Sequence, residues 1–323
     1  MRIGFDLGGT KMLAAVLDEK NNILGKSKAR TGTGDNDTMI AQIVTVIREA
    51  MKDAGDPAIT ALGIAVPGPI DISRGMILEP PNLSLRNAPV ADMLQKELGF
   101  PVVLENDVNA GLWGEYVAGC AQGKSHVIGL FPGTGIGGGI IVDGSLYRGR
   151  MGSAGEVGHM VVQRDGPLCG CGNFGCLEAV ASKTAIARNL AVLAQNGRSP
   201  VLVDAGATDI RQVKSGVIAK ALKAKDPGVA QVIDQAAAFL GIGMANLVNI
   251  FDPELIVLGG GLVEKLGESY VQTAVRAMRH HAMAEIVAGV EVGMAKLGDF
   301  AAVIGAADLA RRIEKPTAPK SGK

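Results

Sequence analysis

The residues best suited to chemistry include a cluster of cysteines. Three of the four cysteines in the chain, Cys169, Cys171 and Cys176, lie within one short glycine-containing stretch. Thiolates this close together are typical zinc ligands, and a structural zinc site is tetrahedral, so it needs a further ligand besides these three cysteines. A disulfide is the alternative, but a reducing cytoplasm disfavours it. The cluster therefore predicts a metal site with a further ligand from elsewhere. Cys120 is one candidate, but its place at the end of the helical stretch 108–120 favours a small buried helical residue.

Two aspartates follow predicted strands. Asp6 comes after the strand that begins the chain, and Asp107 stands where the apolar strand 100–104 gives way to a helical stretch. Sites in α/β folds lie at these carboxyl ends of strands. Asp107 and its neighbour Asn106 could also be helix caps, each worth about 1 kcal/mol. Asp6 could be an ordinary turn residue, so residue types alone leave both interpretations open.

The elements that would position these residues occur twice. The first 30 residues indicate a strand, a turn at Gly8-Gly9-Thr10, an apolar strand, a turn at Asn21-Asn22 and a third strand. Residues 126–149 show the same order, with turns at 133–135 and 143–144. This repetition of an antiparallel meander predicts a duplicated fold with a cleft between the two copies.

The glycine turns suit phosphate groups. Glycines let backbone N–H groups approach an anion closely, and a threonine hydroxyl adds a donor. A third cluster, Gly259-Gly260-Gly261, lies between the strand LIVL and a predicted helix over 262–282, which suits a nucleotide. One such turn could be no more than a hairpin. Two matching turns and the third cluster together favour a polyphosphate ligand.

Two familiar phosphate motifs are excluded. Residues 133–138 satisfy G-x-G-x-x-G, but a strand and a turn follow where that motif needs a helix. Gly123-Lys124-Ser125 resembles the end of a P-loop, but Ala118 stands where the first glycine is required.

Composition limits the possible partners. The chain has 323 residues, a length that indicates about two domains. It has 32 basic and 32 acidic residues, so its charge argues against nucleic acid or an anionic membrane as a partner. The start is unlike a signal peptide, and Asn246 and Asn249 interrupt the most apolar helical stretch, 236–251. We therefore expect a soluble, cytoplasmic protein.

Five motifs, in order, resemble the ROK family of bacterial sugar kinases and repressors. They are DLGGTK (6–11), LENDVNAG (104–111), GTGIGGG (133–139), GEVGH (155–159) and CGCGNFGCLE (169–178). The resemblance covers residues 3–311 and implies an α/β fold of two RNase H-like domains, of the actin and hexokinase type, around a central cleft. By this resemblance residues 1–117 and 299–314 form a small domain, and 118–298 form a large domain with the zinc loop. Residues 315–323 are polar and contain two prolines, so we expect a flexible tail there.

The resemblance also implies a structural zinc site and a sugar site beside it. The four metal ligands would be His159, Cys169, Cys171 and Cys176. The sugar would be bound by Gly68, Asn82, Asn106, Asp107, Glu156, His159 and Glu178. Glu178 could instead be a first-turn helix acid, and Glu156 a solvated loop residue. Leu85 stands where the family often has tryptophan, so we expect a difference in the sugar pocket there.

The donor implied by the resemblance is ATP with Mg²⁺. Asp6 would help to hold the hydrated cation. The ATP site would consist of Asp6, Gly8, Gly9, Thr10, Lys11, Gly133, Thr134, Gly135, Gly260 and Gly261. Asp107 would be the base that takes the proton from the sugar hydroxyl.

The activity expected from the resemblance is ATP-dependent phosphorylation of a hexose at its 6-hydroxyl, with glucose as the preferred acceptor. The alternatives are N-acetylglucosamine, N-acetylmannosamine or fructose, and polyphosphate as donor. A sugar-sensing repressor is less favoured, because repressors of the family carry a DNA-binding segment ahead of the first strand, and here the strand begins at Arg2. A homodimer is the family expectation.

Overall fold

The computed structural model describes residues 1–314, and the predicted tail, 315–323, lies outside the described residues. The chain divides into two compact units. Unit 1 comprises Met1–Gly123, Arg150–Gly152 and the chain from Lys296, and unit 2 comprises Lys124–Gly149 and Ser153–Ala295. The sequence prediction placed the boundaries between the two domains after residue 117 and before residue 299. Residues 119–121 and 296–297 belong to unit 1 because their backbone N–H groups bond to Glu115 of that unit.

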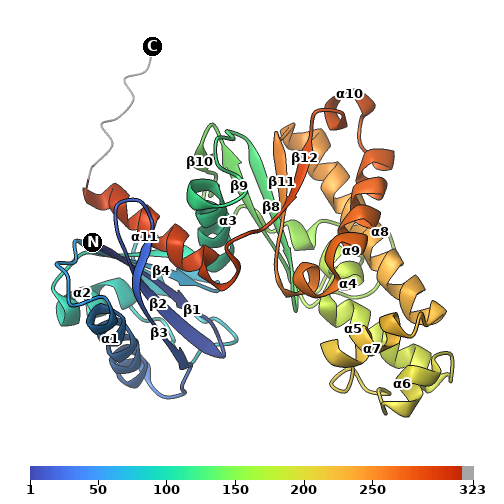
Figure 1. The fold of residues 1–323 in the computed structure, drawn as a ribbon, viewed down its shortest axis with the longest axis horizontal. Helices are drawn as coiled ribbons and strands as arrows, with labels where there is room; N and C mark the ends of the chain where they lie inside the picture. The colour runs from blue at the N-terminus through green and yellow to red at the C-terminus, as the bar shows by residue number, and fades with distance from the viewer. Residues whose placement is uncertain (315–323) are drawn as a thin grey trace. The chain divides into compact units, whose positions relative to one another are not determined.

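Unit 1 is built on a five-stranded sheet in the order β3-β2-β1-β4-β7 (Figure 1). Its strands are β1 (Arg2–Leu7), β2 (Lys11–Leu17), β3 (Ile23–Arg30), β4 (Ala61–Val66) and β7 (Val102–Asn106). β1, β2 and β3 form an antiparallel meander, while β1, β4 and β7 run parallel. A small hairpin, β5 (Ile70–Asp71) and β6 (Met76–Ile77), lies outside this sheet.

Helices cover both faces of that sheet. Helices α1 (Asn36–Asp53) and α2 (Val90–Leu98) pack on one face, whereas α11 (Ala301–Glu314) packs on the other. Helix α3 (Asp107–Ala118) lies against α11, and the short helix η2 (Gly298–Phe300) precedes α11. The alternation of β1 explains the layers, because Ile3 and Phe5 face the α1 side.

Glycines on the other face allow α11 to approach the sheet closely. A Cβ atom added at Gly4 would lie 1.8 Å from the carbonyl oxygen of Val303, and one added at Gly63 would lie 1.9 Å from that of Ala306. A larger residue at Gly4 or Gly63 would therefore push α11 away from the sheet.

Unit 2 repeats this arrangement with the strand order β10-β9-β8-β11-β12. Its strands are β8 (Val127–Pro132), β9 (Ile136–Val142), β10 (Ser145–Leu146), β11 (Leu255–Leu258) and β12 (Glu291–Met294). Again three strands, β8, β9 and β10, form an antiparallel meander. Strand β11 pairs in parallel with β8, and β12 pairs in parallel with β11. The duplication predicted from the two meanders is therefore present in the topology.

The helices of unit 2 are more numerous. They are η1 (Val157–His159), α4 (Leu177–Ala181), α5 (Lys183–Gln195), α6 (Pro200–Asp204), α7 (Ser215–Lys223), α8 (Pro227–Phe251), α9 (Gly261–His281) and α10 (Ala284–Val287). Helix α8 is long and apolar enough to cross a membrane by length and composition alone, but half of that stretch is buried inside the structure. The predicted helix over 262–282 is bent at Gly267, whose φ of 66° suits glycine.

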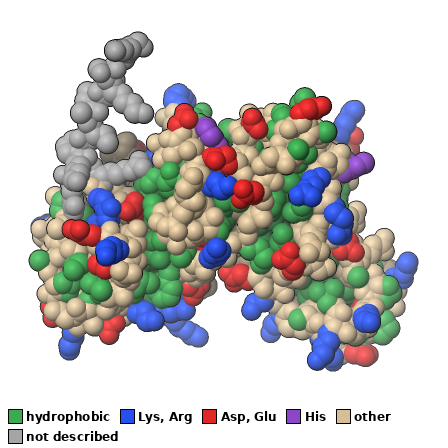
Figure 2. Space-filling view, turned by 45° about the horizontal axis from the view of Figure 1, so that its top comes forward, with side chains coloured by type: hydrophobic (Ala, Val, Ile, Leu, Met, Phe, Trp, Pro, Cys, Tyr) green, Lys and Arg blue, Asp and Glu red, His purple; other side chains and the backbone are tan. Residues whose placement is uncertain are grey.

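On the face shown in Figure 2, basic and acidic side chains are interspersed, in keeping with the equal numbers of the two kinds.

Candidate functional site

Asp6 and Asp107 lie at the same edge of the sheet of unit 1. Asp6 is the last residue but one of β1, rather than following the strand as predicted, and Asp107 begins α3 directly after β7. The strand β4 lies between them, and its Ala65 pairs with Asp6 on one side and with Glu105 on the other. The carboxyl ends of these parallel strands therefore bring the two aspartates near each other.

The surroundings of Asp6 favour its neutral form. Burial raises the pKa of Asp6 from 3.8 to about 7, and the Asp107 carboxylate adds to the effect, whereas Lys11 opposes it. A cation beside Asp6 would restore its charged form. Two neighbouring carboxylates of this kind therefore fit a hydrated Mg²⁺ ion.

Asn106 is the cap of α3. Its side-chain oxygen accepts hydrogen bonds from the N–H groups of Val108, at 3.0 Å, and Asn109, at 3.1 Å. The capping alternative is thus correct for Asn106, and its amide nitrogen is the group that could donate to a ligand. The cap also places Asp107 at the first position of the helix, where an acid is stabilised by the helix dipole.

The first glycine turn, for which phosphate binding is predicted, is tight and lies against Asn82, a predicted sugar-binding residue. The Gly8 N–H donates to the Lys11 carbonyl oxygen at 3.0 Å, and the Thr31 hydroxyl donates to the Gly8 carbonyl at 2.6 Å. A Cβ atom added at Gly9 would lie 2.8 Å from the carbonyl oxygen of Asn82. The structure therefore brings Asn82 beside Gly9, and Thr10, the next residue of the turn, is exposed.

Lys11 is paired with a residue that sequence reasoning missed. Its Nζ lies 2.5 Å from Asp299 Oδ1, and Lys28 Nζ lies 3.3 Å from Asp299 Oδ2. The hydrogen bond from Lys11 lowers the pKa of Asp299. An acidic residue just before the final helix was the only local signal, and it does not reveal a partner in β2.

Two other predicted positions differ in exposure. Gly68 is exposed, two residues after the end of β4. Leu85 is fully buried in the core of unit 1. The leucine at the position of the family tryptophan therefore contributes to packing.

The second phosphate turn, in unit 2, is held by the start of α5. The Gly133 N–H donates to the Gly135 carbonyl oxygen at 2.8 Å. The Lys183 N–H donates to the Gly133 carbonyl at 2.9 Å, and the Thr184 hydroxyl to the Thr134 carbonyl at 2.7 Å. Sequence reasoning missed Lys183 and Thr184, because a helix start far along the chain carries no sign of the turn that it supports.

A cavity of about 360 Å³ adjoins this turn. Its lining includes Thr134, Lys183, Thr184, Arg211, Lys214 and Ser215. Three basic groups and three hydroxyl groups make this cavity suited to an anionic ligand.

The third glycine cluster lies close to the second turn. Gly260 has a φ of 84° and precedes the first residue of α9, as the strand–glycine–helix prediction requires. A Cβ atom added there would lie 2.9 Å from the carbonyl oxygen of Pro132, the residue before Gly133. Gly260 and Gly261 are thus beside the phosphate turn of the same unit.

The cysteine cluster forms a compact set of four donors. The ligand atoms of His159, Cys169, Cys171 and Cys176 lie within 4.8 Å of one another. The Cys171 and Cys176 Sγ atoms are 3.7 Å apart, as are Cys169 Sγ and His159 Nδ1. Zinc with tetrahedral bonds of about 2.0–2.3 Å spaces its ligand atoms by about 3.5–3.8 Å, so the donor set and its spacing fit zinc.

Cys120 is not part of this cluster. It lies in unit 1, half-buried and two residues past the end of α3, so the prediction of a buried helical residue was wrong. The helix ends before Gly119, whose φ of -116° and ψ of -140° are not helical, and the N–H of Cys120 bonds to the Glu115 side chain. Among the described residues, His159 supplies the fourth donor.

The three predicted sugar-binding residues of unit 2 lie around the cluster. His159 Nε2 is 4.0 Å from Glu156 Oε2, and Cys169 Sγ is 3.8 Å from Glu178 Oε1. Glu178 Oε2 accepts a hydrogen bond from the N–H of Ile136, at 2.9 Å. Glu178 is in the first turn of α4, as its alternative interpretation held, and it links the cysteine loop to the second phosphate turn.

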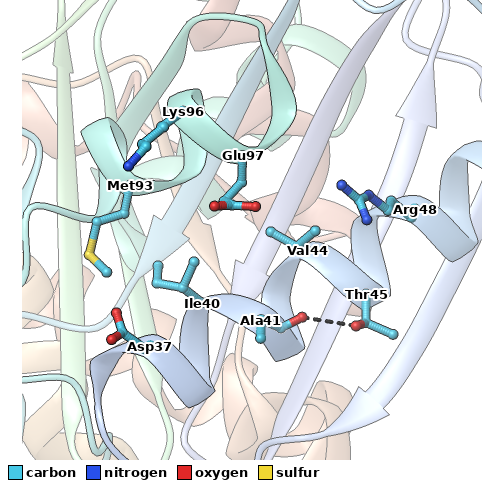
Figure 3. Close-up of a pocket in the computed structure, with 9 residues that line it drawn as sticks. All are labelled: Asp37, Ile40, Ala41, Val44, Thr45, Arg48, Met93, Lys96 and Glu97. Carbon is cyan, nitrogen blue, oxygen red and sulfur yellow. Dashed lines mark hydrogen bonds between the residues drawn. The ribbon is translucent and has the colours of Figure 1, made fainter.

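A larger cavity lies away from these residues. It has a volume of about 510 Å³ and lies between α1 and α2, which supply all of its lining residues (Figure 3). None of the predicted site residues lines it.

Known proteins share this sequence and fold. The model of the ROK family matches residues 2–313. A glucokinase of Streptomyces coelicolor is 36% identical over 96% of this chain and 98% of its own length. A ROK family glucokinase from Streptomyces griseus, solved with glucose and AMPPNP, is 36% identical with a TM-score of 0.80, over 96% of this chain and 99% of that one. A xylose repressor of Caldicellulosiruptor bescii is 31% identical over 94% of this chain and 76% of its own length.

These matches confirm the resemblance and the two-domain α/β fold that it implied. The chain belongs to the ROK family.

Proposed function

We propose that this protein is an ATP-dependent sugar kinase that phosphorylates glucose at its 6-hydroxyl. The observation that carries the proposal is the pair of neighbouring carboxylates, Asp6 and Asp107, at the strand edge that also holds the first phosphate turn. The similarity to glucokinases over nearly the whole chain supports it. Phosphoryl transfer to an alcohol needs a base for the hydroxyl proton and groups that neutralise phosphate charge.

The residues divide into distinct roles. Asp107 accepts the proton of the 6-hydroxyl, and the amide nitrogen of Asn106 donates to a neighbouring sugar hydroxyl. Asp6 holds the cation that accompanies ATP, and this cation would neutralise charge on the phosphates. Gly8, Gly9, Thr10 and Lys11 in unit 1, and Gly133, Thr134 and Gly135 in unit 2, provide donors to the phosphates. Gly260 and Gly261 lie near the adenosine.

The zinc site has a structural role in this proposal. His159, Cys169, Cys171 and Cys176 hold the ion, and its effect is to fix Glu156, His159 and Glu178 in place. The distances between the donor atoms and the contacts of Glu156 and Glu178 support this role. The sugar then binds to residues that the metal holds rigid.

The choice of sugar is tested by a coupled assay of ADP release. Mg-ATP would be offered with glucose, fructose, N-acetylglucosamine and N-acetylmannosamine, and polyphosphate would replace ATP in a parallel series. We expect turnover to be greatest with glucose and ATP. Preference for another sugar would reassign the acceptor, and absence of turnover on every sugar would favour the sensor role of the repressors.

The role of Asp107 is tested by Asp107→Asn. Because the amide cannot take the proton, turnover is expected to fall by at least about 100-fold. Binding of glucose, measured by calorimetry, is expected to change little. Retained turnover would contradict the assignment of the base.

We further propose a cytoplasmic location and a homodimer. The packing of α8 inside unit 2 supports a core helix, and the reduced thiols required by a zinc site suit the cytoplasm. Light scattering of the purified protein would test the dimer.

A further inference from the structure

Glu115 is a buried carboxylate that the proposed chemistry does not use. It lies in the last turn of α3, and its exposed fraction is 0%. Its Oε1 accepts hydrogen bonds from the N–H groups of Lys296 and Leu297, each at 2.8 Å. Its Oε2 accepts one from the N–H of Cys120, at 2.9 Å. A carboxylate removed from water is tolerated only when its oxygens are satisfied in this way.

The donors belong to two segments where the chain passes between the units. The chain leaves unit 1 after Gly123 and returns to it at Lys296. The backbone carbonyl of Glu115 also accepts hydrogen bonds from Gly119 and Ala121, each at 3.0 Å. A single residue therefore binds both connecting segments, although they are separated by more than half of the chain.

The space around this carboxylate is closely fitted. A Cβ atom added at Gly119 would lie 2.0 Å from Glu115 Oε2. Next to Glu115, a Cβ added at Gly114 would lie 2.1 Å from the carbonyl oxygen of Ala301, so α3 and α11 are in direct backbone contact. The end of α3 cannot shift without moving the connecting segments or α11.

The other end of the same helix carries Asp107. Glu115 is eight residues further along α3, a distance of about 12 Å at 1.5 Å per residue. A helix of this length is a rigid element, so displacement of one end is transmitted to the other.

From these contacts we propose that Glu115 is a positioning residue that ties both connecting segments to the helix carrying Asp107. Through this tie, the positions of the connecting segments and of the base Asp107 depend on one another. The inference rests on the proposed kinase function for its kinetic consequence, but the tie itself is a property of the fold.

The test compares Glu115→Gln with a matched control, Asp226→Asn. The first substitution keeps the size of the side chain but presents an NH₂ group where an oxygen accepted a hydrogen bond. Asp226 is also a buried acid, with 5% exposure, and its carboxylate accepts backbone N–H groups from Gly228 and Val229. It lies at the start of α8 in unit 2, so its loss affects one unit only.

We expect Glu115→Gln to lower turnover and Asp226→Asn to lower stability. Glu115→Gln should lower kcat at least about tenfold, because displacement of a base by a fraction of an ångström is costly. The KM values for glucose and ATP should change less than about threefold, because Glu115 has no substrate role. Deuterium uptake should rise in peptides covering 119–123 and 296–298. Asp226→Asn should lower the melting temperature while kcat stays within about twofold of the original.

Two outcomes would overturn the proposal. One is an unchanged kcat and unchanged deuterium uptake in Glu115→Gln. The other is a fall in kcat of the same size in both variants, which would indicate general destabilisation. If Glu115→Gln fails to fold, Gly119→Ala displaces the same carboxylate while retaining it, and the same kinetic change is expected. If the original protein has no kinase activity the proposed function fails, whereas the deuterium uptake still tests the tie.

Discussion

Asp6 illustrates how the surroundings of one residue decide its chemistry. Sequence reasoning identified it as an acid near a glycine turn, and no local pattern indicated that its pKa is raised. Burial and the negative charge of Asp107, which follows β7 on the other side of β4, together raise the pKa of Asp6 to about 7. A cation placed beside Asp6 would offset the negative charge that burial makes unfavourable.

The pKa of Asp6 predicts how stability depends on pH in magnesium-free buffer. Because the folded pKa lies above the unfolded value, the folded state retains its proton between about pH 4 and pH 7, and stability falls as pH rises through that window. Asp6→Asn removes this loss. The variant should match the original protein at pH 4 and exceed it at pH 8 by at most about 4 kcal/mol.

Urea unfolding at the two pH values measures this difference. Equal free energies of unfolding at pH 8 would show that the Asp6 carboxylate is not destabilising. Turnover should be lost in the same variant, since an amide is a weaker cation ligand.

At the scale of elements, turns and loops are held by parts of the chain that are distant in sequence. The second phosphate turn is fixed by the start of α5 and by Glu178 of α4. In the cysteine cluster, His159 belongs to η1 and Cys176 is the residue before α4. Metal binding should therefore order the entry to α4, and with it the Glu178 contact with the turn.

Two cysteine variants test whether the cysteine loop depends on a bound metal. Cys171→Ser replaces an exposed ligand, and we expect zinc affinity to fall at least about tenfold and the glucose KM to rise. Cys120→Ser is the matched control, because Cys120 lies outside the cluster. Metal analysis of the purified proteins should find about one zinc per chain in the original and in Cys120→Ser. Absence of zinc from the original protein would refute the metal site.

The whole molecule has separate hydrophobic cores in its two units. The core of unit 2 gathers residues from β8, β9 and β11 with α4, α5, α8 and α9, whereas unit 1 has its own clusters on both faces of its sheet. We therefore expect the contacts in one core to depend little on packing in the other.

This separation predicts a local response to metal removal. Chelation should raise deuterium uptake in peptides covering 157–178 of unit 2, because a structural zinc contributes folding energy to its own loop. The strands β1, β4 and β7 of unit 1 should exchange as before. A general rise in uptake across both units would contradict the independence of the cores.

Local sequence patterns predicted the two meanders, their duplication and the motifs that belong to the family. These are local properties: the period of the apolar residues, the glycines in the turns and the spacing of the cysteines are all contained in short stretches. The cysteine cluster, the two phosphate turns, the strand before Gly260 and the helix after Asp107 could be placed in this way. The bend of α9 at Gly267 and the end of α3 before Cys120 could not, because both depend on neighbours outside the helix.

The pairing of side chains from distant segments depends on the tertiary structure. Lys11 pairs with Asp299 across 288 residues, and Glu115 bonds to Lys296 across 181. Such pairs arise because α11 packs on the sheet of unit 1 and brings the end of the chain to its beginning. A sequence pattern reflects only the environment of its own segment. The partner of a buried or paired charge depends on which segments pack together in the fold.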